Sequence, residues 1–135
     1  MNRPITTRGH GMLDYPLGLV LLLTPNLLGF ADVGGAAVWV PRIIGILTLV
    51  QSIFTRYELG LVKVLPMRMH LMNDYLAGAF LAASPWLFGF YDAVNQRIWL
   101  PHLIVGLGVL LATALTQKEP RQLRAGDRTH TPAHA

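Results

Sequence analysis

Two short clusters of polar side chains hold the residue types that could do chemistry in this chain. In each cluster a histidine precedes an aspartate by four residues, and a tyrosine follows the aspartate directly. The six residues are His10, Asp14, Tyr15, His70, Asp74 and Tyr75. Residues four apart share one helix face, so each cluster presents an imidazole beside a carboxylate. Such groups can ligate a divalent metal through nitrogen and oxygen, or relay protons, because histidine titrates near neutral pH.

A structural role accounts for the same clusters and is the interpretation favoured by the sequence alone. A carboxylate near the start of a helix complements the helix dipole, and a tyrosine is common at a membrane interface. Metal binding by His10, Asp14, His70 and Asp74, and proton or ion handling, remain alternatives. No nucleophile–base pair or phosphate cradle is recognisable, so no catalytic residue, enzymatic activity or cofactor is predicted. The absence of cysteine excludes thiol chemistry and cysteine metal sites.

The elements that position these clusters come from an internal duplication. Identical residues recur at an offset of sixty positions without a gap, among them polar, aromatic, glycine and proline positions. In the first copy they are His10, Met12, Asp14, Tyr15, Gly18, Leu21, Pro25, Leu27, Gly29, Phe30, Asp32, Trp39, Pro41, Ile44 and Leu47. Shared apolar composition does not explain such matches, so the chain consists of two copies of one unit.

Composition places both units in a membrane. Only 13% of the residues are charged and 53% are hydrophobic, which departs from the balance of soluble domains. Four stretches nearly free of charge, residues 15–31, 36–54, 75–91 and 98–116, are each long enough to cross about 30 Å of hydrocarbon as a helix. We therefore expect an all-α polytopic membrane protein with helices at about 10–30, 36–55, 70–90 and 97–116, and no β-sheet.

Basic residues predict the direction of the four spans. Nine of the eleven lie before the first span, between the second and third, or after the fourth: Arg3, Arg8, Arg56, Lys63, Arg68, Lys118, Arg121, Arg124 and Arg128. By the positive-inside rule both termini and the central loop are cytoplasmic. Each copy contains two spans, so both copies insert with the same orientation. The basic residues then contact lipid headgroups, and no nucleic-acid partner is predicted.

A proline-containing tripeptide near the end of the first span of each copy is the other notable motif. It reads Thr24-Pro25-Asn26 in the first copy and Ser84-Pro85-Trp86 in the second. Proline lacks a backbone donor and clashes with the preceding turn, and the residue before it can act as an N-cap. The motif therefore predicts a helix that kinks, or stops and restarts.

Two copies of a two-helix unit, with Ser84-Pro85-Trp86 in the second and a degenerate Thr24-Pro25-Asn26 in the first, resemble the SPW repeat family of small bacterial integral membrane proteins. The resemblance covers roughly residues 8–116. It implies a fold and a location in the bacterial cytoplasmic membrane, and it transfers no catalytic residues.

These observations divide the chain into five segments: a cytoplasmic arm at 1–9, the first repeat at 10–55, a cytoplasmic loop at 56–69, the second repeat at 70–116 and a disordered cytoplasmic tail at 117–135. The predicted function is a non-catalytic accessory, assembly or structural role. Its partners would be the lipid bilayer and either further copies of this chain or another membrane protein. The alternative is binding or transport of a metal, a proton or a small ligand through the His/Asp/Tyr clusters.

Overall fold

The computed structural model describes residues 2–120 and is all-α, as the sequence predicts. Its elements are α1 (Thr7–Leu27), the short 3-10 helix η1 (Ala31–Val33), α2 (Gly35–Phe54), α3 (Met67–Leu87) and α4 (Gln96–Leu115). Within residues 2–120 no strand forms, and pairing is limited to two isolated bridges. The predicted tail lies outside the described residues from position 121 onward.

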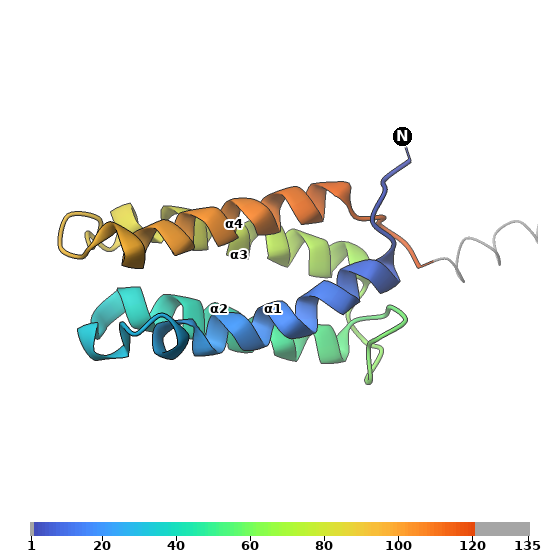
Figure 1. The fold of residues 1–135 in the computed structure, drawn as a ribbon. Coiled ribbons are helices and arrows are strands. Elements are labelled where there is room, and N and C mark those ends of the chain that lie inside the picture. The colour runs from blue at the N-terminus through green and yellow to red at the C-terminus, as the bar shows by residue number, and fades with distance from the viewer. Residues whose placement is uncertain (1, 121–135) are drawn as a thin grey trace, which may run out of the picture.

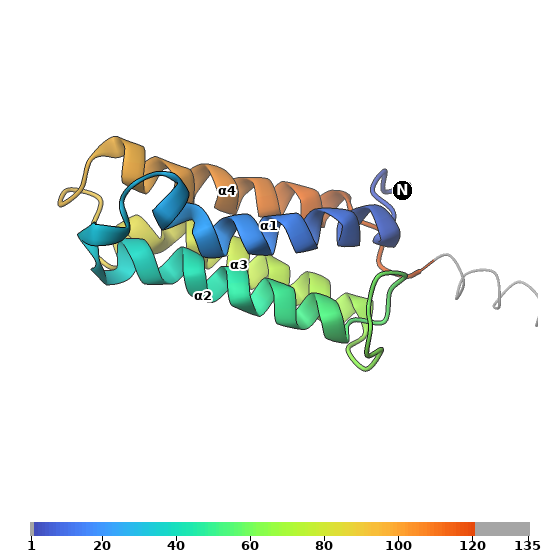
Figure 2. The same ribbon diagram turned by 60° about the horizontal axis from the view of Figure 1, so that its bottom comes forward.

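The four helices run side by side as two hairpins, α1 with α2 and α3 with α4 (Figures 1 and 2). The short connections within the hairpins lie at one end of the bundle. The loop between α2 and α3 lies at the other end, with the start of α1 and the end of α4. Each histidine is the fourth residue of its helix, α1 or α3, and each aspartate is the eighth, so both pairs lie near this second end.

The two hairpins correspond at two different offsets. From α1 to α3 the helix boundaries shift by sixty residues, but from α2 to α4 they shift by sixty-one (Gly35 to Gln96). The extra residue lies in the α3–α4 connection, which spans 88–95 where the α1–α2 connection spans 28–34. The alignment without a gap therefore holds for the first helices and needs a one-residue gap for the second helices.

Each hairpin is closed by a pair of glycines whose backbones touch. A Cβ added to Gly45 would lie 2.6 Å from the carbonyl oxygen of Gly18, and one added to Gly106 would lie 2.6 Å from that of Gly78. Small residues allow such close helix approach, and the van der Waals packing that it permits favours helix association in a lipid environment. Gly18 and Gly78 are sixty residues apart, as α1 and α3 are, and Gly45 and Gly106 are sixty-one apart, as α2 and α4 are.

The helices continue through the prolines of the tripeptide motif instead of stopping there. α1 passes Pro25 and α3 passes Pro85, and each ends two residues later. Ser84 is not an N-cap: its hydroxyl donates to the carbonyl of Leu81 at 2.7 Å. Pro85 has no N–H for that carbonyl, so the serine side chain supplies the missing donor. Thr24 differs, because its hydroxyl donates at 2.7 Å to the carbonyl of Val20 and not to that of Leu21, which Pro25 leaves without its backbone donor.

The N-terminal arm packs against the end of α4. The backbone N–H of Ile5 donates to Leu115, and that of Gln117 donates to Ile5. Thr6 then caps α1 by accepting from the N–H of Gly9 at 3.0 Å, which satisfies one of the free donors of the first turn. These contacts start α1 at Thr7, three residues before the predicted start.

Two of the described helices, α2 and α4, are long and apolar enough to cross a membrane. α1 and α3 have 21 residues each, but they carry the two histidine–aspartate pairs. Large apolar side chains are nonetheless exposed on all four helices, including Leu19 on α1, Ile46 on α2 and Leu76 on α3.

Candidate functional site

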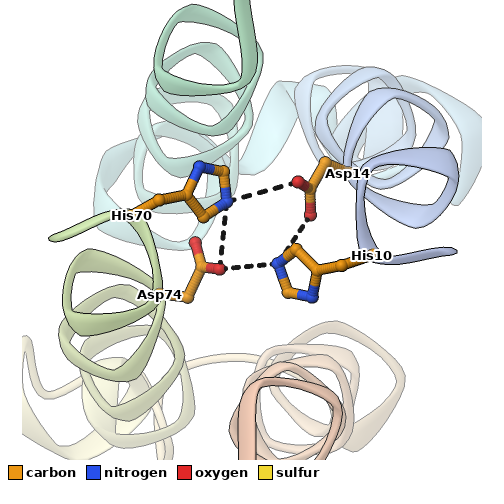
Figure 3. A group of neighbouring side chains, drawn as sticks. All are labelled: His10, Asp14, His70 and Asp74. Carbon is orange, nitrogen blue, oxygen red and sulfur yellow. Dashed lines mark hydrogen bonds and ion pairs between the residues drawn. The ribbon is translucent and has the colours of Figure 1, made fainter. Parts of the chain in front are cut away.

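The two histidine–aspartate pairs meet between α1 and α3 in a closed ring of alternating side chains (Figure 3). His10 Nε2 lies 3.2 Å from Asp14 and 2.9 Å from Asp74, while His70 Nε2 lies 3.2 Å from each of the two carboxylates. One ligand atom from each residue can be chosen so that all four lie within 4.8 Å of one another. Each hairpin supplies one histidine and one aspartate.

This ring, which we call the His/Asp cluster (His10, Asp14, His70 and Asp74), is buried. No member exposes more than 5% of its surface, and His70 exposes none. The α2–α3 loop covers it, because Tyr57 of that loop is 1% exposed and its ring centroid lies 5.6 Å from that of His70. Burying two carboxylates is costly unless opposite charge compensates them.

Two threonines determine which nitrogen of each histidine carries a proton. The Nδ1 atom of His10 lies 2.8 Å from the hydroxyl of Thr116, and that of His70 lies 2.6 Å from the hydroxyl of Thr55. Both threonine hydroxyls donate to the backbone carbonyl four residues earlier, at 2.6 Å. A hydroxyl that has already given its proton accepts from Nδ1–H, so each neutral imidazole directs its Nε2 lone pair into the ring.

These threonine contacts cross between the hairpins. Thr55 caps α2 of the first hairpin and serves His70 of the second, while Thr116 caps α4 and serves His10. An imidazole that donates from one nitrogen and presents the other to the interior has the arrangement seen in metal-binding histidines.

The carboxylates also have fixed partners, which differ between the two hairpins. Gln51 of α2 donates its amide N–H to Asp74, and the Tyr57 hydroxyl donates to Asp14 at 3.2 Å. Burial raises the pKa of the Tyr57 phenol well above its ordinary value, which keeps this group a neutral donor. Both aspartates are thereby held as acceptors that face the histidines.

The charge balance of the cluster depends on the histidine protons. With neutral imidazoles protonated at Nδ1, two Nε2 lone pairs and two carboxylates face one another at 2.9–3.2 Å. With a proton on Nε2, His10 instead donates to Asp74 at 2.9 Å. His70 Nε2 lies close to both carboxylates, yet its geometry forms a hydrogen bond with neither, which leaves a buried nitrogen without a partner. Among residues 2–120 no lysine or arginine pairs with either aspartate. A divalent cation inside the ring, or a proton on each Nε2, would supply the missing charge.

The tyrosines of the two sequence clusters do not line the ring. The Tyr15 hydroxyl donates to the backbone carbonyl of Leu59 at 2.8 Å and so ties α1 to the α2–α3 loop. Tyr75 is 38% exposed on the outer side of α3. Of the six candidates, the structure brings together the two histidines and the two aspartates.

The tripeptide motif lies at the opposite end of the bundle from the cluster. Trp86 is 50% exposed and its ring stacks on Tyr91 at 5.2 Å. In the first copy Asn26 stands at this position and accepts a hydrogen bond from Arg42 at 2.8 Å. Trp86 therefore packs against its own hairpin and does not contribute to the His/Asp cluster.

His102 is a further buried histidine at this end of the bundle. In the ungapped alignment it corresponds to the partly exposed residue Arg42, but His102 is only 3% exposed. At the offset of sixty-one that relates α4 to α2, His102 corresponds to Pro41, on the inner face of the helix. Its Nε2 lies 2.9 Å from the carbonyl of Ala37, which has no backbone donor because Pro41 lacks an N–H. His102 thus joins α4 to α2.

Four residues around the cluster are not found by sequence reasoning: Gln51, Thr55, Tyr57 and Thr116. The threonines could have been found as the hydroxyl residues that end the second helix of each copy, but their spacing of sixty-one hides them from an alignment at sixty. Gln51 corresponds to Leu111 at that offset and to Ala112 at sixty-one, so no repeat signal marks it.

Comparison with known proteins gives one match. The chain matches the SPW repeat domain over residues 8–116, which includes all four helices except the first residue of α1. Searches of curated proteins and of solved structures find no match to this chain. The match spans both hairpins and both tripeptides, in agreement with the resemblance seen in the sequence. This chain is therefore a member of the SPW repeat family.

Proposed function

We propose that this protein crosses the bacterial cytoplasmic membrane four times and holds a divalent transition-metal ion in the His/Asp cluster, at the cytoplasmic end of the bundle. The observation that carries the metal assignment is the convergence of four buried ligand atoms, two nitrogens and two oxygens, within 4.8 Å of one another. Separated clusters would have favoured interfacial helix caps. Converging clusters favour the alternative of metal binding over the purely structural role.

The distances around the ring suit a small metal ion. A tetrahedral zinc site with bonds of about 2.0–2.1 Å places neighbouring ligand atoms about 3.3 Å apart. The four nitrogen–oxygen separations in the cluster are 2.9–3.2 Å, and Asp14 makes its two through different oxygens. Because one ligand atom from each residue can be chosen within 4.8 Å of the others, a rearrangement of side chains would bring the set around an ion. Imidazole and carboxylate donors without thiolate suit zinc, iron or manganese. We assign no catalytic reaction to this site.

An apolar barrier favours a resident ion over a transported one. Leu21, Val40, Ile44 and Leu81 pack together in the middle of the bundle, and Leu81 is fully buried. This layer separates the His/Asp cluster from the opposite end of the molecule. A desolvated ion would face a large energetic cost in crossing it.

The lengths and exposed apolar side chains of all four helices support the proposal of four spans, although only α2 and α4 are apolar enough by composition. Helices of 20 and 21 residues extend about 30 Å at 1.5 Å per residue, the thickness of the hydrocarbon core. The four members of the His/Asp cluster on α1 and α3 lie at the cytoplasmic end and are buried against one another, so they do not contact lipid.

Single cysteines test this topology, because the chain has none of its own. Lys63→Cys in the α2–α3 loop and Asp92→Cys in the α3–α4 connection mark opposite ends of the bundle. In intact cells we expect an impermeant thiol reagent to label only Asp92→Cys, and Lys63→Cys only after permeabilisation. Labelling of Lys63→Cys in intact cells would contradict the orientation.

Metal content tests the proposed site. Full-length protein purified in mild detergent should bind about one zinc or cobalt ion per chain after metal loading and removal of excess metal. Two variants preserve side-chain size but weaken a ligand, Asp14→Asn and Asp74→Asn. Two others remove a ligand, His10→Ala and His70→Ala. Each of the four should abolish stoichiometric metal binding. Asp92→Asn, an exposed aspartate at the other end, is the matched control and should bind as the original chain does. Folded protein that binds no metal would refute the proposal.

Association with another helix is a second candidate role, favoured by the exposure of α4. In the most apolar stretch of α4 only 17% of the residues are buried, against 39% in that of α2. Three large side chains of α4 are each more than half exposed: Ile104, Leu107 and Leu111. A Cβ added at Gly108 would meet open space, so another helix can approach closely here. Native mass spectrometry in mild detergent would detect a dimer or a copurifying membrane protein, and only monomer would count against this role.

A further inference from the structure

A small cavity adjoins the His/Asp cluster on the side facing the middle of the bundle. It has a volume of about 30 Å³ and is lined by residues of all four helices. His10, Asp14 and Asp74 form its polar end. Its other walls are mainly apolar and include Leu17, Leu21, Ile44, Ala77, Leu81 and Val109, with two threonines, Thr48 and Thr113, among them.

The other sides of the cluster are covered by protein groups with fixed partners. The Thr55 and Thr116 hydroxyls contact the outer nitrogens of the two histidines. Gln51 and Tyr57 donate to the two carboxylates. A metal in the ring would therefore meet unfilled space toward the cavity.

We propose that a metal held by the His/Asp cluster keeps an exchangeable coordination position that opens into this cavity, and that an uncharged diatomic molecule of the dioxygen type binds there. This inference rests on the proposed metal site. Non-haem iron bound by two histidines and a carboxylate keeps coordination positions open for a further ligand.

Size and polarity select this class of ligand. A cavity needs roughly 10–15 Å³ to hold one water, and about 150 Å³ accommodates benzene. The observed 30 Å³ therefore admits a molecule of two heavy atoms and excludes most organic substrates. Asp14 and Asp74 at the polar end repel an anion, and the mainly apolar walls would not replace its hydration. Apolar gases concentrate in the hydrocarbon that surrounds the bundle, so they can reach the site from the membrane.

Nitric oxide on ferrous protein is a direct probe of the open position. Full-length protein is loaded anaerobically with Fe²⁺, its iron content is measured, and nitric oxide is added. We expect one iron per chain and the electron paramagnetic resonance signal of a high-spin ferrous nitrosyl. Ala77→Leu fills the cavity and should reduce the signal at least tenfold at equal iron content. Ala79→Leu adds the same side chain at an exposed position of the same helix and should leave the signal unchanged.

A gentler pair on α4 keeps the test informative if Ala77→Leu does not fold. Ala112→Val adds two methyl groups to the cavity wall, and Ala114→Val adds them on the exposed side. Iron-loaded protein that forms no nitrosyl, or that forms it equally in filled and control variants, overturns the cavity ligand and leaves the metal site standing. Failure to bind iron, cobalt or zinc refutes the metal site and the ligand position together.

Discussion

Replacement of Thr116 by valine tests the assignment of the histidine protons. Valine keeps the shape of threonine but offers no acceptor, so the Nδ1–H of His10, now 2.8 Å from the hydroxyl, is left buried without a partner. Such a loss costs about 1–3 kcal/mol. Removing the partner of a metal-binding histidine typically lowers metal affinity about 10- to 100-fold, which corresponds to about 1.4–2.7 kcal/mol. We expect a decrease in this range.

The assay is a cobalt titration followed by visible absorption, with zinc competition to extend it to tight binding. Thr113→Val is the matched control, because Thr113 is also fully buried on α4 and its hydroxyl donates to the carbonyl four residues earlier at 2.7 Å. Its hydroxyl contacts neither histidine of the cluster. Equal loss of affinity in Thr113→Val and Thr116→Val would refute the reasoning, and so would unchanged affinity in Thr116→Val.

Two further predictions concern the helices that position the cluster. In a denaturation assay, Gly106→Ala should lower the free energy of unfolding by about 1–3 kcal/mol through overpacking, because the added Cβ would lie 2.6 Å from the Gly78 carbonyl oxygen. Gly108→Ala is the control, since a Cβ there meets open space, and it should be neutral or stabilising. Ser84→Ala should lower the free energy of unfolding by about 1 kcal/mol in the original chain. In a chain that already carries Pro85→Ala it should lower it by almost nothing, because the alanine at position 85 restores the backbone N–H that the serine replaces. A double-mutant cycle with no coupling between positions 84 and 85 would contradict the compensation.

The hairpins follow from sequence because each depends on local features. Apolar stretches of spanning length define the helices, and short connections make neighbouring helices antiparallel. The spacing of His10 and Asp14 likewise places both on one face of α1 without knowledge of the rest of the fold. Whether this face meets the equivalent face of α3 depends on how the hairpins pack, and no local pattern encodes that packing.

Proline positions show why a local rule can mislead. Pro85 predicts a kink or an interruption because it removes a donor, but α3 continues to Leu87, and the Ser84 hydroxyl donates to the unpaired carbonyl at 2.7 Å. At Pro41 the compensation comes from His102, sixty-one residues later. The first kind of compensation is visible in the tripeptide itself, whereas the second requires knowledge of which helices touch.

The crossing of the threonine contacts implies that neither hairpin can form the cluster alone. Each histidine lies on the first helix of one hairpin, and its acceptor ends the second helix of the other. Two hairpins are thus the smallest unit that satisfies both imidazoles. This requirement gives the duplication a physical reason, since fusing two copies in one chain makes the association of the hairpins intramolecular.

Fusion also allows the two halves of the cluster to differ. Gln51 donates to Asp74, while Leu111 or Ala112 stands at the corresponding place in the second hairpin. Tyr57, which donates to Asp14, belongs to the loop that exists only between the hairpins. The carboxylates therefore have an amide partner on one side and a phenol partner on the other. An association of two identical hairpins would impose equal surroundings on both aspartates, so this asymmetry depends on the single chain.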